Sequence, residues 1–338
     1  MNTELLATHS PALFGAAVAR VVAVLRRGEV VALPTETVYG LAANALDPEA
    51  VMRIYEAKGR PAHNPIIVHV ASVAMAQHCV ASWPVLASRL ATAFWPGPLT
   101  LVLRRSRDIP DIVTARGETV GVRWPAHPFM QAVIAGCGFP LAAPSANLSN
   151  CLSPTSAGHV LQSLGGRIPL IVDGGPSQVG IESTVLDLCV SPPRVLRPGM
   201  IHDESLLAVT GELQSAENKL REESGALRSP GMLERHYAPK TRLVVFSWEN
   251  DTDLRSQLSV RHTSGETTYV IAHTHIPGGG GFAGVSVIPH DADAFGRALY
   301  AELHRCDESK PALIVVEAPP NQPEWRAIAD RLTRAAAM

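Results

Sequence analysis

The sequence has few cysteines and no paired-cysteine motif. Five cysteines are spread over 338 residues, and no two of them form a C-x-x-C pair. An odd and scattered set argues against a disulfide framework and against a zinc ribbon. Reduced thiols of this kind are typical of the cytosol. We therefore expect a cytoplasmic protein that is held together by its hydrophobic core.

The chain also lacks the features of an exported or membrane-spanning protein. Glu4 stands where a secretory signal carries Lys or Arg, and Arg20 interrupts the apolar stretch from Ala12 to Leu25. No acidic or basic residue occurs between Trp124 and Gly166, but prolines and amides break every window of membrane-spanning length. We interpret that stretch as a buried, loop-rich wall.

Neither an excess of charge nor a phosphate loop is present. A net charge of -2 excludes a polycation that binds nucleic acid through counterion release, so any RNA contact must be local. No G-x-x-x-x-G-K-[ST] motif occurs. The Gly279-x-Gly281-x-x-Gly284 stretch leads into the strand-like residues 285–288 instead of a helix, which argues against a dinucleotide site. A bound nucleotide would need side chains to hold its phosphates.

Length and hydrophobic periodicity predict two α/β domains, because 338 residues exceed what one core usually supports. In the first part, β-branched runs alternate with helical patterns. We expect strands at 29–33, 66–70, 99–103, 119–122, 170–172 and 183–188, and helices at 12–25, 48–58, 84–94, 127–135 and 155–164. The predicted organisation is a catalytic domain over 1–205, a polar linker over 206–240 and a smaller α/β domain over 241–338.

Polar motifs cluster at the ends of the predicted strands of the first domain. They are Pro34-Thr-Glu-Thr-Val-Tyr-Gly-Leu41, Lys58-Gly-Arg-Pro-Ala-His-Asn-Pro65 with His69, Gly121-Val-Arg-Trp-Pro125, Pro144-Ser-Ala-Asn147, Gly180-Ile-Glu-Ser-Thr184 and Arg194-Val-Leu-Arg-Pro-Gly199. A guanidinium such as that of Arg123 can pair with a carboxylate through two parallel hydrogen bonds. Hydroxyls and cations in this mixture are typical of a site for a polar, anionic small molecule.

In their order and spacing these motifs resemble the threonylcarbamoyl-AMP synthase family, the YrdC-like enzymes, in the long form with a C-terminal Rossmann-like domain. The likeness runs from about residue 28 to 200 and resumes at Ser229-Pro-Gly-Met-Leu-Glu-Arg-His-Tyr-Ala-Pro239. It implies a mixed α+β fold, with a twisted mixed β-sheet flanked by helices and an open groove. It also implies that L-threonine, bicarbonate or CO2 and ATP give threonylcarbamoyl-AMP and pyrophosphate, for the N6-threonylcarbamoyl modification of adenosine 37 in tRNA.

The resemblance also assigns roles to residues of this sequence. Threonine is expected against Thr37, His69, Arg123 and Ser183, and the transferring group near the catalytic cations Lys58 and Arg60. ATP is expected against Arg60, Asn64, Thr119, Ser145, Ser153, Arg197 and, from the linker, Tyr237. Mg2+ would come with ATP, and no protein side chain is assigned to it. The linker is expected to close as a lid, and the product to pass to a separate tRNA transferase complex.

Several of these residues have simpler interpretations. Lys58 and Arg60 could form a solvated helix end, and His69 could be a satisfied core residue. Arg123 could pair with Glu118 or Glu36.

Other simple interpretations concern loops and strand ends. Ser145 and Asn147 could cap the next helix. Glu182 reads as a solvent-facing group at a strand end, and the run Arg104, Arg105 and Arg107 as a solvated hairpin end. Asn150 stands where the family has Gly, and it can adopt the left-handed backbone that such a turn needs.

Two other functions compete with the synthase. One is a carbamoyl-adenylate-forming carbamoyltransferase of the hydrogenase-maturation type, but that resembles a longer chain with C-x-x-C zinc motifs. The other is an RNA-binding or ribosome-assembly module, against which the balanced charge argues.

Overall fold

The computed structural model describes residues 2–61, 64–214, 237–278 and 280–337. The chain divides into two compact units, of which the first comprises residues 1–149 and 153–232 and the second residues 150–152 and 233–338. Among the described residues, every helix is too short or too polar to span a bilayer.

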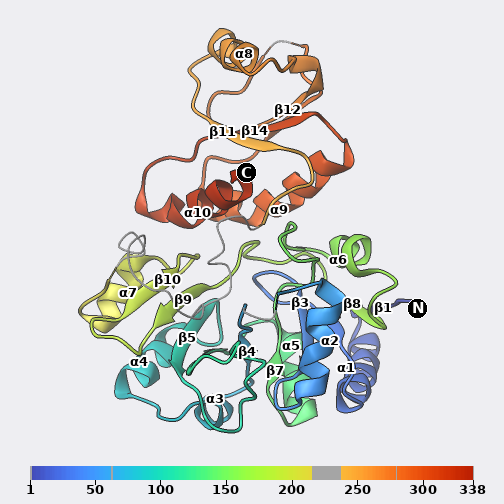
Figure 1. The fold of residues 1–338 in the computed structure, drawn as a ribbon, viewed down its shortest axis with the longest axis vertical. Coiled ribbons are helices and arrows are strands. Elements are labelled where there is room, and N and C mark those ends of the chain that lie inside the picture. Colours follow the sequence, from blue (N-terminus) through green and yellow to red (C-terminus); the bar gives the residue numbers. More distant parts are fainter. Residues whose placement is uncertain (1, 62–63, 215–236, 279, 338) are drawn as a thin grey trace. The chain divides into compact units, whose positions relative to one another are not determined.

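The first unit is built on one ten-stranded mixed sheet in the order β1-β8-β2-β3-β7-β4-β6-β5-β9-β10 (Figure 1). Its strands are β1 (Glu4–Ala7), β2 (Val31–Leu33), β3 (Gly40–Asn44), β4 (Val68–His69), β5 (Leu99–Arg104), β6 (Thr119–Arg123), β7 (Leu141–Ala142), β8 (Leu170–Asp173), β9 (Thr184–Asp187) and β10 (Arg194–Arg197). Its helices are α1 (Pro11–Arg26), α2 (Pro48–Lys58), α3 (Val73–Cys79), α4 (Val85–Phe94), α5 (Pro128–Cys137), α6 (Ala157–Leu164) and α7 (Asp203–Thr210).

Capping residues in the sequence define both ends of α2, the helix that carries Lys58. The Asp47 side chain accepts hydrogen bonds from the backbone N–H groups of Glu49 and Ala50, and Pro48 takes the first helical position of α2. Gly59 ends the helix in the left-handed conformation, with a φ of 57°. Lys58 therefore stands at a defined helix end, directly before the loop to β4.

Two hydrophobic clusters sandwich the first half of the sheet. Helices α1 and α5 bury Val21 and Phe129 against one face, together with Leu33 of β2. On the other face, α2 buries Ile54 against Leu41 of β3 in the larger cluster, which continues along the sheet to α3, α4 and α7.

The second unit contains a four-stranded parallel sheet in the order β11-β14-β12-β13. Its elements are β11 (Leu243–Phe246), α8 (Asp251–Val260), η2 (Gly265–Thr267), β12 (Thr268–Ala272), β13 (Gly284–Val287), α9 (Ala292–Glu308), β14 (Leu313–Glu317), η3 (Pro323–Trp325) and α10 (Arg326–Ala336). The predicted fold class is confirmed. Gly284 opens a strand, as the sequence predicted, so the glycine-rich stretch is not a strand-to-helix turn.

The sequence predicted the longest helices and strands correctly, but not several of the shorter ones. It did not foresee β1, β3, β7, β10, α3, α7 or α8. Helix α7 crosses the predicted boundary at residue 205, and its Leu206 is fully buried in the larger core cluster. The packed part of the first unit therefore extends into the stretch that was predicted to be linker.

The position of α7 gives a direct test. Leu206→Ala should lower the free energy of unfolding by about 2–5 kcal/mol, because it leaves a cavity in a closed core. The adjacent Leu207 is 46% exposed and provides the matched control, Leu207→Ala. Urea denaturation measures both variants. Equal stability of the two would show that α7 is not part of the core.

Candidate functional site

The candidate site lies on one face of the β4, β6, β5 and β9 part of the sheet. Neighbouring residues of a strand face opposite sides of a sheet. In β6, Val120 and Val122 belong to the large core cluster, so Thr119, Gly121 and Arg123 lie on the other face. The strand thus buries its valines and presents a row of polar and small residues.

The pairing of neighbouring strands brings further residues to this face. His69 of β4 lies opposite Arg123 in a parallel pair, and Val102 of β5 lies opposite Gly121 in an antiparallel pair. Thr100, two residues before Val102, faces the same side of β5 and pairs in register with Val185 of β9. Residues far apart in the sequence are therefore neighbours on one surface.

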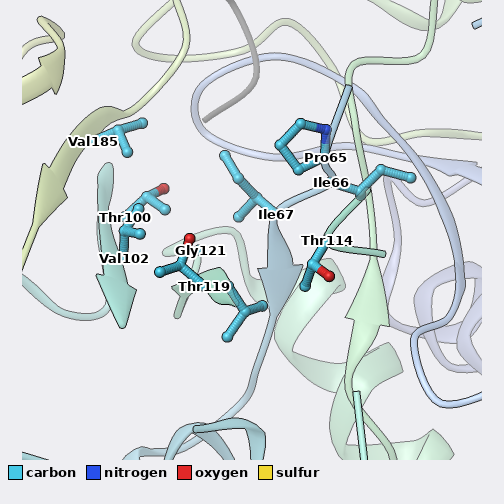
Figure 2. Close-up of a pocket in the computed structure, with 10 residues that line it drawn as sticks. Pro65, Ile66, Ile67, Thr100, Val102, Thr114, Thr119, Gly121 and Val185 are labelled. Carbon is cyan, nitrogen blue, oxygen red and sulfur yellow. The ribbon is translucent and has the colours of Figure 1, made fainter. Parts of the chain in front are cut away.

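A pocket opens on this surface (Figure 2). In this view Thr100, Val102 and Val185 lie on one side, and Pro65 and Thr114 on the other. Neighbouring side chains lie close to the backbone of Gly121. A Cβ atom at this position would come within 3.1 Å of the Thr100 Cγ2 methyl and 3.4 Å of Ile67 Cγ1. Thr119, one of the predicted ATP residues, also lines this pocket.

Arg123 is the charged centre of the site, with 4% of its surface exposed. Its Nε donates to the Gly97 carbonyl at 3.2 Å, Nη1 to Thr37 Oγ1 at 2.9 Å and Nη2 to Glu36 Oε1 at 2.6 Å. A guanidinium has five N–H groups. Within the described part of the chain, these contacts leave one N–H on each terminal nitrogen.

Glu36 compensates the charge of Arg123. Burial alone would raise the pKa of the Glu36 carboxyl, but the charge and hydrogen bond of Arg123 outweigh it and lower the pKa below its usual range. The simple interpretation that Arg123 pairs with Glu36 is therefore confirmed. Pairing with Glu118 is wrong, because that residue reaches Arg104 at 4.0 Å.

The loop that carries Thr37 is fixed by distant segments. The Val179 N–H donates to the Glu36 carbonyl at 2.7 Å, and the Gly180 N–H to the Thr37 carbonyl at 3.1 Å. The Thr35 and Thr37 hydroxyls lie 2.9 Å apart, and both residues are buried. The loop presents Thr37 to Arg123 in one defined arrangement.

His69 is buried as a neutral imidazole. Loss of solvent and the nearby charge of Arg123 lower its pKa to about 3. Its Nδ1 has no hydrogen-bond partner among the residues that the structure describes. The described residues thus leave one ring nitrogen unsatisfied, which differs from the interpretation of His69 as a satisfied core residue.

Ser183 is held from two sides. The Arg197 Nη2 donates to Ser183 Oγ at 3.1 Å and to its carbonyl at 2.9 Å. The Ser183 and Thr100 hydroxyls lie 2.8 Å apart. Arg197, predicted to contact ATP, thus also positions a residue predicted to contact threonine.

Lys58 and Arg60 are buried, with 2% and 9% of their surfaces exposed, so the solvated helix end is wrong. Lys58 Nζ donates to the carbonyls of Ser145 and Asn147, each at 2.5 Å. Arg60 donates to the carbonyls of Asn64 and Pro65 at 3.2 and 2.8 Å. Both cations therefore shape the loops that carry the predicted ATP residues.

The Asn64 side chain completes this part of the site. It is fully buried, and neither atom of its amide group has a partner among the described residues. A buried amide that the described residues do not satisfy calls for a partner such as a water, an ion or a ligand. The adjacent residues 62 and 63 lie outside the described residues.

The segment from 145 to 156 follows a course the sequence only partly predicted. Ser145 and Asn147 do not cap α6, because the Ser156 side chain does so by accepting from the His159 N–H. Asn150 has a φ of 65°, the left-handed conformation that its position required. Ser153 is fully buried and donates to Glu182 Oε1 at 2.5 Å.

The interpretation of Glu182 as a solvent-facing group is wrong, since only 7% of its surface is exposed. Arg105 of the basic run pairs instead with Asp111 at 2.5 Å and donates to the Ile109 carbonyl, whereas the Arg104 side chain is 74% exposed. The sequence did not single out Glu36 or Thr100 as functional. A threonine within the apolar run Leu99-Thr-Leu-Val-Leu103 was the available signal for Thr100.

Tyr237 belongs to the second unit, where it is buried at a positive φ of 62° beside the rings of Tyr300 and the guanidinium of Arg331. Its predicted contact with ATP stays a prediction. Most of the predicted lid, residues 215–236, lies outside the described residues.

The first unit therefore presents a face with hydroxyls, buried cations and unsatisfied buried groups, which defines an α/β protein that binds a polar, anionic small molecule without a phosphate loop. Family models match both units: one described as "Telomere recombination" over residues 23–199, and one described as "Threonylcarbamoyl-AMP synthase, C-terminal domain" over 201–337.

Curated and solved relatives agree. A threonylcarbamoyl-AMP synthase of Bacillus subtilis is 41% identical over 99% of this chain and 95% of its own length. One from Pyrococcus abyssi is 47% identical over 67% of each chain. The crystal structure of P. abyssi Sua5 complexed with L-threonine has a TM-score of 0.88 and 36% identity, covering 99% of this chain and 98% of that one.

The chain belongs to the threonylcarbamoyl-AMP synthase family. Its activity class is that of an adenylate-forming, nucleotidyltransferase-type enzyme of tRNA modification, as the resemblance implied.

The depressed pKa of His69 gives a prediction for stability. Unfolding exposes the ring, whose pKa returns to about 6.5, so the unfolded state takes up a proton between that value and about 3. Stability from the neutral ring is therefore complete above pH 6.5 and falls as the pH falls, by at most about 1.4 kcal/mol per pH unit.

The variant His69→Gln removes this titration. The difference in unfolding free energy between the wild type and His69→Gln should then shrink on acidification from pH 6.5 to 4, as measured by urea denaturation. The exposed His78 supplies the control variant His78→Gln. A difference for His69→Gln that does not depend on pH would contradict a buried neutral ring.

Proposed function

We propose that the protein joins L-threonine, bicarbonate or CO2 and ATP into threonylcarbamoyl-AMP and pyrophosphate. The observation that carries the proposal is the arrangement of donors around Arg123. Its two remaining N–H groups lie on different terminal nitrogens, which is the pattern that a carboxylate accepts in two parallel hydrogen bonds. Buried but charge-compensated, this guanidinium suits the α-carboxylate of an amino acid.

The groups around Arg123 fit the rest of a threonine molecule. Thr37 and Ser183 supply hydroxyls, and His69 supplies a neutral ring whose Nδ1 has no partner among the described residues. A site that hydrogen-bonds a substrate hydroxyl rejects analogues without one, since buried polar groups would be left unpaired. The related P. abyssi Sua5 was crystallised with L-threonine, which supports the same substrate for this chain.

For ATP, we propose that side chains replace a phosphate loop. Lys58 at the end of α2, Arg60 in the loop that carries Asn64, and Arg197 of β10 are buried cations. Lys58 donates to the carbonyl of Ser145 and Arg60 to that of Asn64. Thr119 lies at the other end of β6 from Arg123, about 13 Å away along an extended strand. This separation gives room for a nucleotide beside an amino acid. Tyr237 is proposed to add a contact from the second unit.

In the proposed reaction, the threonine amine and CO2 form a carbamate, whose oxygen attacks the α-phosphorus while pyrophosphate leaves. No covalent enzyme intermediate is needed. The protein positions the two reactants and compensates developing negative charge with Lys58 and Arg60. A free carbamate decomposes in water, so a site that excludes water favours the reaction.

We propose that Mg2+ enters bound to the phosphates of ATP. Mg2+ prefers oxygen ligands and keeps several waters, so substrate phosphates and one or two carboxylates usually hold it. The two carboxylates beside the site are already engaged, Glu36 by Arg123 and Glu182 by Ser153. No cluster of three or more potential ligands occurs in the described residues. When bound, the ion would neutralise phosphate charge.

We also propose a cytoplasmic enzyme whose product passes to a separate transferase complex acting on tRNA. The scattered cysteines and a balanced charge support this placement, with at most a weak direct tRNA contact.

One assay tests the proposed reaction. Purified protein should release pyrophosphate from ATP only when threonine and bicarbonate are both present, because the carbamate is the nucleophile. Serine or valine in place of threonine should be poor substrates. Release that ignores threonine or bicarbonate would contradict the proposal.

The role of Arg123 can be tested separately. Arg123→Lys keeps a positive charge beside Glu36 but loses the paired N–H groups. We expect the KM for threonine to rise on the order of tenfold or more, with a much smaller change in the KM for ATP. Arg104→Lys, on an exposed side chain at the end of β5, is the control. An unchanged KM for threonine would exclude Arg123 as the carboxylate anchor.

A further inference from the structure

Thr100 is an unassigned polar residue beside the threonine site. It interrupts an apolar strand, is fully buried and faces the same side of the sheet as Gly121. A valine would fill the same space without a hydroxyl that needs a partner. The role of this hydroxyl therefore depends on its hydrogen-bond partner.

The neighbours of Thr100 fix the direction of its hydroxyl. Its Cγ2 methyl lies over Gly121, where a Cβ atom would come within 3.1 Å of it. Its Oγ1 lies 2.8 Å from Ser183 Oγ. Threonine has few χ1 rotamers, so the space above Gly121 and the contact with Ser183 select one of them together. Figure 2 shows Thr100 beside Gly121.

The distance allows either hydroxyl to donate, and in each case one buried proton has no acceptor in the described part of the chain. If Ser183 donated, the unpaired proton would be that of Thr100. If Thr100 donates, the unpaired proton is that of Ser183, and a substrate bound against Ser183 can satisfy it. Arg197 Nη2 donates to the same Ser183 oxygen at 3.1 Å.

The consequence concerns the proton of Ser183. With Thr100 as the donor, the Ser183 oxygen accepts from both Thr100 and Arg197, so the two lone pairs are occupied and the O–H bond is turned away from both partners. We propose that Thr100 is a positioning residue that makes Ser183 a hydrogen-bond donor toward an acceptor atom of the substrate threonine. This inference rests on the proposed function, in which Ser183 contacts threonine.

The test uses the full-length protein and compares hydroxyl-deleting with hydroxyl-keeping variants. Thr100→Val keeps the shape and removes the hydroxyl, Thr100→Ala removes both, and Thr100→Ser keeps the hydroxyl. Thr268→Val in the second unit is the matched control, because Thr268 is also fully buried with its Oγ1 donating to a single carbonyl, that of Ser264 at 2.8 Å. Pyrophosphate release gives the KM for threonine and for ATP in each variant.

We expect Thr100→Val to raise the KM for threonine about tenfold, as the loss of one oriented hydrogen bond does, and to leave the KM for ATP within about twofold. Thr100→Ser should stay close to the wild type, and Thr268→Val should change neither constant selectively. If Thr100→Val fails to fold, Thr100→Ala is compared with Thr100→Ser, from which it differs by the hydroxyl alone. In a Ser183→Ala background, Thr100→Val should have no further effect on the KM for threonine, because the residue it positions is gone.

Three results would overturn the inference, and they can be told apart. If Ser183→Ala raises the KM for threonine but Thr100→Val does not, Thr100 does not position Ser183, while the proposed site stands. If Ser183→Ala leaves the KM for threonine unchanged, the proposed threonine site itself fails. Equal rises in both KM values for Thr100→Val, with a lower melting temperature, would show a structural role only.

Discussion

The buried guanidinium of Arg123 is the constraint on which the site depends. Moving an unpaired charge into a protein interior costs several kcal/mol, so such a group persists only with a full set of partners. Three come from the protein: the Gly97 carbonyl, the Thr37 hydroxyl and the Glu36 carboxylate. The Thr37 hydroxyl and the Glu36 carboxylate lie in the loop after β2, and the Gly97 carbonyl lies in the turn before β5. Satisfying Arg123 therefore fixes the loop after β2 and the turn before β5 at the same time.

The sheet extends this constraint to the rest of the site. Side chains alternate between the two faces of a strand. In β6 this alternation separates the valines, which join the core, from Thr119, Gly121 and Arg123 on the other face. Non-sequential strand order places β5 between β6 and β9, so Thr100 reaches Ser183 across 83 residues of sequence. Rigid strands hold these groups in place, so the loop residues have only a short distance to span to the site.

Sequence predicted what depends on local pattern. Strong β-branched runs, the Asp47-Pro48 start of α2 and the turn at Asn150 are local, and the structure has all three. The strand β3, with the sequence Gly-Leu-Ala-Ala-Asn, carries no such signal, and β7 has only two residues. Family resemblance supplied the motif residues, but not their partners.

The partners depend on register and burial, which one sequence does not display. Glu182 looks like a solvent group until Ser153, 29 residues earlier in the chain, is seen to donate to it. Lys58 and Arg60 look like an exposed helix end, yet Lys58 donates to carbonyls of the later segment 145–147 and Arg60 to carbonyls of its own loop.

The same partners determine how the threonine site responds to pH. Arg123 stays protonated at any physiological pH, and the lowered pKa of Glu36 keeps that carboxylate ionised. His69, with a pKa of about 3, remains neutral. The charge on these three side chains is therefore constant across the physiological pH range. In the proposed reaction, the ammonium group of threonine has no lone pair and must lose a proton before it can form a carbamate. A site of fixed charge leaves the substrate amine as the titrating group, and the protein contributes by holding that amine where its deprotonated form can react.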